Sequence, residues 1–417
     1  MQRDTCIRRM AALAGLFLAL GASAQEPSYR PEEIFVPQTS EFTQHHPLAG
    51  ITSFDLSPDG KTLAVEFGTQ EPDKTIGAWV AVWDVNQQRL IGAKQVDRDI
   101  PYIVWYRRKI GFSPDGRMLL VLTGPRLVAL SFPELKILYA FEDRVLPENA
   151  QNQMFIEGFA IAANRLAILR QYDNNSDHSY SLEVKIVDLD SGRVLARWSK
   201  SGYSRSISLS PDGNLLALTI NPVPWGERNI PAGENNGFIV KPDSGEIVRA
   251  LNLGYAAGDA EFLPGGTELI TVPIDHGEAQ FYPQDAVKVW NVKTGQVERK
   301  LGYPKYGVRG AMSISANGEW AAVTNVWLNP MDLKFDRGPT RGYARLLVWN
   351  LASGRLVYDS GNLGREYNLG GAPIDLLMGA GPPAVLVRMS ASGNRLALGG
   401  ELISVYSVET ARPGPGS

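Results

Sequence analysis

Apolar and polar residues alternate along most of this chain, and the same tight turn interrupts the alternation several times. In 207–219, ISLSPDGNLLALT, apolar residues at every second position lead into Ser-Pro-Asp-Gly, and a second apolar run follows. Near-copies occupy 54–66 and 110–122. A period of two is typical of β-strands, and Pro, Asp and Gly suit the successive corners of a β-turn. The pattern therefore predicts a repeated antiparallel hairpin.

The turn defines seven units along the chain. Complete turns lie at 57–60, 113–116 and 210–213, and reduced ones lie at 263–266, 315–318 and 390–393. The remaining unit, IAANRLAIL at 161–169, keeps both strands but has lost two turn residues. A third strand with a second tight turn follows in each unit, as in LLVWNLASGRLVY at 346–358. Each unit therefore predicts four short antiparallel strands, repeated every 50 residues or so.

The third strands carry a second signature at their ends. It is Trp83-Asp84, Trp290-Asn291 and Trp349-Asn350, with a weaker form at Val187-Asp188. With these motifs the chain resembles the WD-repeat family of β-propellers over nearly all of the sequence after residue 24. The resemblance implies an all-β, seven-bladed propeller of four-stranded antiparallel blades. It also implies an interaction scaffold rather than a catalyst.

The two ends of the chain are expected to share the last blade. The seventh unit has no fourth strand after 401–408, whereas IFVPQTSEFTQHH at 34–46 precedes the first unit and predicts a strand. We expect this N-terminal strand to complete the seventh blade and close the ring, because closure removes an open sheet edge.

The first 24 residues have the pattern of a secretory signal peptide. Arg3, Arg8 and Arg9 precede an apolar stretch at 11–22, and small residues at 22–24 suit a cleavage site. We expect cleavage after Ala24, a single propeller domain at 25–410 and a flexible tail at 411–417. The expected location of the protein is periplasmic or secreted.

Composition narrows the partners. Cleavage would change the formal charge from −3 to −5, because it removes three arginines and one aspartate, and it would remove the one cysteine, Cys6. A mildly acidic chain argues against nucleic acid as a partner, and a chain without cysteine has no disulfide. No later apolar run is long enough to span a membrane. We expect a monomer with a protein partner.

Long connections gather on one rim of the predicted propeller. They join second to third strands and fourth to first strands, at 68–78, 171–182, 220–236, 272–286, 325–344 and 359–384. They are rich in Trp and Arg, which are typical anchors of protein interfaces. The candidate partner-binding residues are Trp225, Arg228, Trp327, Arg337, Arg341 and Arg365. The alternative is that these side chains pack within their own loops.

Three arginines stand before the first strands, which ring the central channel of a propeller. Arg108 and Arg205 lie five residues before the turn serine, and Arg309 lies six before it. They could hold an anionic ligand or a partner carboxylate. The alternative is ordinary ion pairing, for instance with Glu157 or Asp259.

We therefore expect an exported binding or scaffold propeller that holds a protein partner on its long-loop rim. One alternative is a periplasmic enzyme, because exported propellers of similar appearance include lactone hydrolases and dehydrogenases. Another is a binder of a small anionic ligand or glycan. The sequence has no nucleophile elbow, zinc-protease motif or P-loop, and 173–178 lacks the glycine and closing acid of a calcium loop. No catalytic, metal or cofactor site is predicted.

Overall fold

The computed structural model describes fifteen stretches of the chain. They are 28–37, 50–70, 76–100, 109–123, 126–142, 152–174, 179–221, 235–254, 257–273, 287–302, 311–328, 341–361, 366–368, 386–399 and 403–411. All regular structure in these stretches is β-strand. The predicted signal peptide and tail lie outside them, apart from residue 411.

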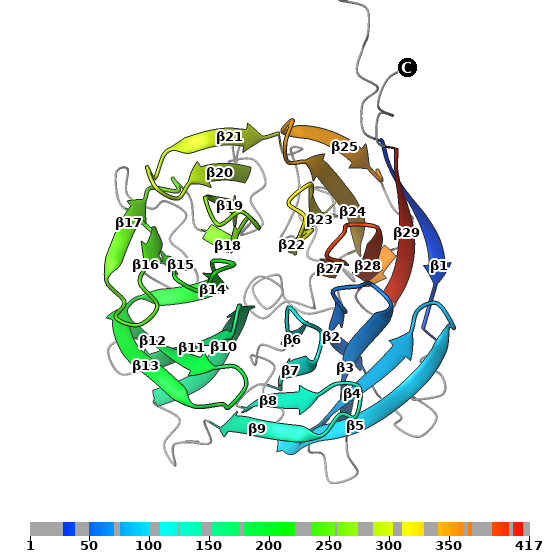
Figure 1. Ribbon diagram of the computed structural model, residues 1–417, viewed down its shortest axis with the longest axis horizontal. Coiled ribbons are helices and arrows are strands. Elements are labelled where there is room, and N and C mark those ends of the chain that lie inside the picture. Colours follow the sequence, from blue (N-terminus) through cyan, green and yellow to red (C-terminus); the bar gives the residue numbers. More distant parts are fainter. Residues whose placement is uncertain are drawn as a thin grey trace, which may run out of the picture.

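The strands form seven antiparallel sheets arranged as a ring (Figure 1), which confirms the predicted fold class. Blade 1 contains β2 (Gly50–Leu56), β3 (Thr62–Gln70), β4 (Ile76–Asp84) and β5 (Arg89–Ile100). Blade 2 contains β6 (Lys109–Phe112), β7 (Met118–Leu122), β8 (Arg126–Ser131) and β9 (Ile137–Glu142). Blade 3 contains β10 (Asn152–Ala162), β11 (Arg165–Asn174), β12 (Ser179–Asp188) and β13 (Val194–Ser201). Blade 4 contains β14 (Tyr203–Leu209), β15 (Leu216–Asn221), β16 (Gly237–Val240) and β17 (Ile247–Leu251).

The other three blades follow the same order. Blade 5 contains β18 (Ala257–Phe262), β19 (Glu268–Pro273), β20 (Val287–Asn291) and β21 (Val297–Leu301). Blade 6 contains β22 (Met312–Ile314), β23 (Trp320–Leu328), β24 (Arg341–Asn350) and β25 (Arg355–Asp359), and β26 (Glu366–Asn368) pairs with β24. Blade 7 contains β27 (Leu386–Met389), β28 (Arg395–Gly399), β29 (Ile403–Ala411) and β1 (Ser28–Phe35).

The repeated turns are held by side-chain hydrogen bonds. In the first of them Ser57 Oγ donates to Asp59 Oδ1 (2.7 Å) and accepts from the Thr62 amide (2.9 Å). The turns at Ser113, Ser210 and Ser315 repeat both bonds. The Asp or Asn after each signature tryptophan closes the second turn, as where Asn350 Oδ1 accepts from the Ser353 amide (2.9 Å). The repeated motifs are therefore devices that fix hairpin geometry.

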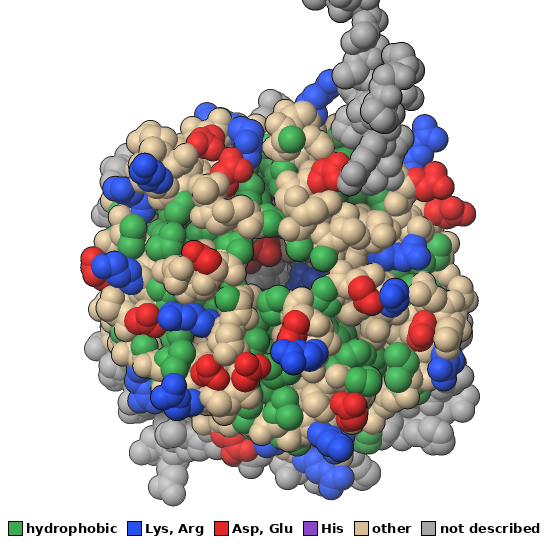
Figure 2. All heavy atoms as spheres, viewed as in Figure 1, with side chains coloured by type: hydrophobic (Ala, Val, Ile, Leu, Met, Phe, Trp, Pro, Cys, Tyr) green, Lys and Arg blue, Asp and Glu red, His purple; other side chains and the backbone are tan. Residues whose placement is uncertain are grey.

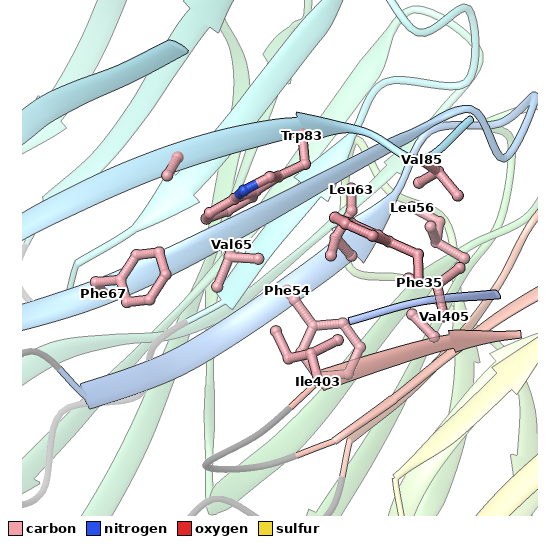
Figure 3. Packing of buried hydrophobic residues seen from close by; sticks show 12 residues of the cluster. Phe35, Phe54, Leu56, Leu63, Val65, Phe67, Trp83, Val85, Ile403 and Val405 are labelled. Atoms are coloured by element: carbon pink, nitrogen blue, oxygen red, sulfur yellow. The ribbon is translucent and has the colours of Figure 1, made fainter. Parts of the chain in front are cut away.

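The hydrophobic core lies between the blades. Buried side chains form seven clusters, each shared by neighbouring sheets. The cluster between blades 7 and 1 joins Phe54, Leu63 and Trp83 to Ile403 and Val405 (Figure 3). Each blade buries both of its faces, so the ring is one continuous packing unit.

Strand β1 closes the ring as the fourth strand of blade 7, which confirms closure by the N-terminus. The strand lies at Ser28–Phe35 and not at 34–46 as the sequence predicts; residues 38–49 lie outside the described part. Its pairing with β29 runs from Ser28 to Phe35 and is interrupted by a bulge between Glu33 and Phe35. The outer strand is polar and shows little alternation of apolar and polar residues. The prediction therefore placed the strand at the apolar residues where β1 ends.

The strands run further into the long connections than the sequence predicts. β11 and β12 pair without a break from Arg165–Asp188 to Asn174–Ser179, and β3 and β4 pair as far as Gln70 and Ile76. Most of 68–78 and 171–182 is therefore strand. The connections at 222–236, 274–286 and 329–340 separate the strands on either side of them, and all leave from the same rim.

Candidate functional site

The first strands of the blades line a central channel. These are β2, β6, β10, β14, β18, β22 and β27, which surround the axis in Figure 1. Counted back from the turn serine or its equivalent, the second and fourth positions bring charged side chains toward one another across this channel, whereas Ala311 and Leu386 at the fourth position pack against hydrophobic clusters between blades. The second position back holds Asp55, Gly111, Ala160, Ser208, Glu261, Ser313 and Arg388, and the fourth holds Ser53, Lys109, Gly158, Ser206, Asp259, Ala311 and Leu386.

Serine and aspartate at these positions tie neighbouring blades together. Ser206 and Ser208 accept from the Ala260 and Phe262 amides at 3.0 and 3.2 Å. Ser53, Asp55 and Ser313 do the same for Ile110, Phe112 and Met389 at 3.2, 2.9 and 2.9 Å. A first strand is the inner edge of its sheet, so its outward amides need such partners. These bonds fix the channel wall.

Charged side chains occupy the channel on blades 1, 2 and 7. Asp55 Oδ1 lies 3.7 Å from Arg388 Nε, while its Oδ2 accepts the Phe112 amide. Lys109 Nζ donates to the Phe159 carbonyl (2.8 Å) and lies 5.0 Å from the centre of the Phe159 ring. Burial raises the pKa of Asp55 and lowers the pKa of Lys109. Both groups are thus less easily charged than in water.

Two further carboxylates project from β18 of blade 5. Burial is the main cause that raises the pKa of Glu261 to about 7; nearby Arg388 and Lys109 oppose the rise, and Asp259 and Asp55 add to it. Glu261 has no hydrogen-bond or salt-bridge partner among the described residues. A carboxyl group that titrates near neutrality inside a channel is typical of a functional position.

The predicted channel-mouth arginines are only partly described. Arg205 lies in β14, where the register shifts between Ser204 and Ser206, but its side chain is outside the described part. Arg108 and Arg309 lie outside it entirely. Of the partners considered for them, Glu157 is buried and accepts a hydrogen bond from Tyr203 (3.3 Å), and Asp259 faces the channel.

The predicted rim residues are likewise only partly described. Trp327 is the next-to-last residue of β23 and lies opposite Tyr343, and Arg341 begins β24 opposite Asn368 of β26. Both therefore belong to one hairpin that extends toward the long-loop rim, although their side chains are outside the described part. Trp225, Arg228, Arg337 and Arg365 lie outside the described residues.

The charged group inside the channel was not predicted from the sequence, apart from Asp259, which was considered only as an ion-pair partner of the predicted arginines. It consists of Asp55, Lys109, Asp259, Glu261 and Arg388. The signal was present, because these residues occupy the second or fourth position before the turn in their units. The predicted arginines lie five or six residues before the turn, whereas the members of this group lie two or four residues before it.

Two features are absent from the part of the chain that the structure describes. No group of three or more His, Cys, Asp and Glu side chains within it is placed to hold a metal ion. None of its segments is a helix long and apolar enough to cross a membrane.

Comparison with known proteins shows the fold alone. No family model and no curated protein sequence matches the chain. Among solved structures, a chain of "Crystal Structure of Mitotic Checkpoint Complex" is similar, with 13% identity and a TM-score of 0.52 over 91% of this chain and 90% of that one. A chain of "Kuenenia stuttgartiensis Hydrazine Synthase" has 14% identity and a TM-score of 0.47 over 87% of this chain and 96% of that one. The chain is thus an all-β, seven-bladed propeller.

Proposed function

We propose that this protein is an exported, monomeric scaffold that binds a protein partner on its long-loop rim. The observation that carries the proposal is the difference between the two rims. Turns of two to six residues cover one rim, whereas connections such as 222–236, 274–286 and 329–340 leave from the other. Long connections on a rigid frame are the usual carriers of binding residues.

Two further observations support binding. The hairpin β23–β24 extends past its blade neighbours and brings Trp327 and Arg341 to the same end, and β26 widens it. The solved structure with 13% identity is named as a complex, so a propeller of this shape also occurs in a protein assembly. Trp and Arg on such an extension suit a protein interface.

The test is a pull-down from periplasmic extract followed by measurement of the affinity of any recovered partner. We expect the double substitution Trp327→Ala/Arg341→Ala to weaken that partner by tenfold or more, about 1.4 kcal/mol or above. Arg117→Ala and Lys61→Ala change exposed side chains on the tight-turn rim and serve as controls. A partner that binds all variants equally would refute the rim assignment.

Export is tested separately by the N-terminus of the protein isolated from cells. A start at Gln25 in the periplasmic or culture fraction is the expected result. A full-length chain that remains in the cytoplasm would contradict it, whatever the pull-down shows.

A further inference from the structure

Small residues line part of the central channel, and charged side chains line the rest. At the equivalent positions blades 3, 4 and 6 hold Gly158, Ala160, Ser206, Ser208 and Ser313, none of which is charged. Blades 1, 2, 5 and 7 contribute all the charged side chains at the corresponding positions. Figure 2 shows a hollow at the centre of the molecule, with acidic and basic side chains inside it.

The charges are separated across the channel. Lys109 and Arg388 come from blades that flank blade 1, whereas Asp259 and Glu261 come from blade 5, on the other side of the ring (Figure 1). In Figure 2 the acidic and basic atoms likewise lie on different sides of the hollow. The channel therefore has one wall with two cations and Asp55, which lies 3.7 Å from Arg388, facing an acidic wall.

Charged groups on the two opposite walls affect one another without forming direct pairs across the channel. Lys109 and Arg388 lower the pKa of Glu261, and Glu261 and Asp259 raise that of Lys109, yet no salt bridge joins the two walls within the described residues. One bond of the Lys109 ammonium goes to the Phe159 carbonyl, which leaves two of its three donors for another acceptor. Both walls thus offer polar groups toward the centre of the ring.

We propose that the central channel binds a compact zwitterion, an α-amino acid, with its carboxylate toward Lys109 and Arg388 and its ammonium toward Asp259 and Glu261. A simple anion would meet the two carboxylates of blade 5, and a simple cation would meet Lys109 and Arg388. A zwitterion complements both walls at once and brings no net charge into the channel. This site goes beyond the proposed rim function and does not depend on it.

The experiment is calorimetric titration of the full-length mature protein at pH 8 with each of the twenty amino acids. For the best ligand, its N-acetyl derivative and its decarboxylated amine are titrated as well. We expect at least one amino acid to bind with a Kd below about 1 mM, and both derivatives to bind at least tenfold more weakly. Each derivative lacks one of the two charges that the channel is proposed to recognise.

Substitutions locate the binding site. Glu261→Gln and Lys109→Met should each raise the Kd at least tenfold. Glu134→Gln and Lys94→Met remove the same charges from exposed positions and should leave the Kd unchanged. If a channel variant fails to fold, the derivative series on the unaltered protein still decides the question. Absence of binding by all twenty amino acids, or equal binding of a derivative, would overturn the proposal.

Discussion

Glu261 shows how a single buried carboxyl group links the channel to pH. Asp259 and Asp55 and the cations Lys109 and Arg388 all act on it, and burial is the strongest influence on its pKa. The pKa is about 7 in the folded chain, against 4.5 ordinarily. The folded state therefore binds the proton more tightly than the unfolded state between these values. Stability from this group falls as pH rises from 4.5 to about 7 and stays lower above that.

Replacing Glu261 by Gln removes this titration. We expect Glu261→Gln to be more stable than the parent by about 1–3 kcal/mol at pH 8, with the difference vanishing near pH 4. Urea unfolding across this pH range measures it. Equal stability of the two proteins at pH 8 would show that Glu261 is ionised without penalty.

Gly245 shows how closely neighbouring blades approach at the outer wall. It has φ +70°, and a Cβ there would lie 2.6 Å from the Trp198 ring, whose Nε1 donates to the Pro242 carbonyl (2.7 Å). We expect Gly245→Ala to destabilise the protein by about 2–4 kcal/mol, from backbone strain and overpacking together.

Gly361 provides the matched control for this substitution. It has φ +60°, and no atom of the described residues lies within 4 Å of a Cβ there. Gly361→Ala should therefore introduce only backbone strain and destabilise the protein by about 1 kcal/mol. Thermal unfolding of both variants separates backbone strain from overpacking. Equal losses of stability in the two variants would show that overpacking against Trp198 contributes nothing.

At the scale of elements, β11, β12 and β13 share a buried ionic cluster. Arg170 Nη1 lies 2.6 Å from Glu183 Oε1, and both side chains are 8% exposed. Glu183 also lies 3.8 Å from Lys185 and 3.5 Å from Arg197. By alternation along β11, Arg170 shares the face of Leu166 and Ile168, which packs on blade 2. Glu183 therefore faces three cations at an interface between blades.

Removing that carboxylate should be costly. We expect Glu183→Gln to destabilise the protein by about 3–5 kcal/mol, because it removes a buried carboxylate that lies against Arg170 and Lys185. The double substitution Arg170→Met/Glu183→Leu should destabilise the protein less than Glu183→Gln does. Glu246→Gln, in the exposed Lys241–Glu246 pair, should change stability by less than about 1 kcal/mol. A loss in Glu183→Gln no larger than in Glu246→Gln would contradict the assignment.

The sequence predicted elements better where their residues repeat. Ser-Pro-Asp-Gly and the Trp-Asp ends located the hairpins, because these motifs make the turn hydrogen bonds themselves. It placed the closing strand at 34–46 because SYRPEEIF has no clear period of two. The channel group escaped because its members lie far apart in the chain and meet only when the ring closes. Most rim candidates lie outside the described residues and stay predictions.

At the scale of the molecule, stability depends on one strand that contacts both neighbours of blade 7. Tyr29 of β1 is 2% exposed, and its ring centre lies 5.3 Å from that of Trp320 in blade 6. Phe35, beyond the bulge, points to the opposite face and packs with Leu56 and Leu63 of blade 1 (Figure 3). The bulge reverses the side on which alternate residues lie, so a single strand joins the first and sixth blades through the seventh.

Deleting residues 28–35 should therefore disrupt the whole ring. The deletion exposes the edge of β29 and the apolar surfaces that Tyr29 and Phe35 cover, and open edges promote aggregation. We expect the truncated protein to lose its cooperative thermal transition and to elute as aggregates in size-exclusion chromatography. A variant that lacks only 412–417, after β29, should melt like the parent. A soluble, monomeric deletion variant with an unchanged melting temperature would mean that the other blades close the ring without β1.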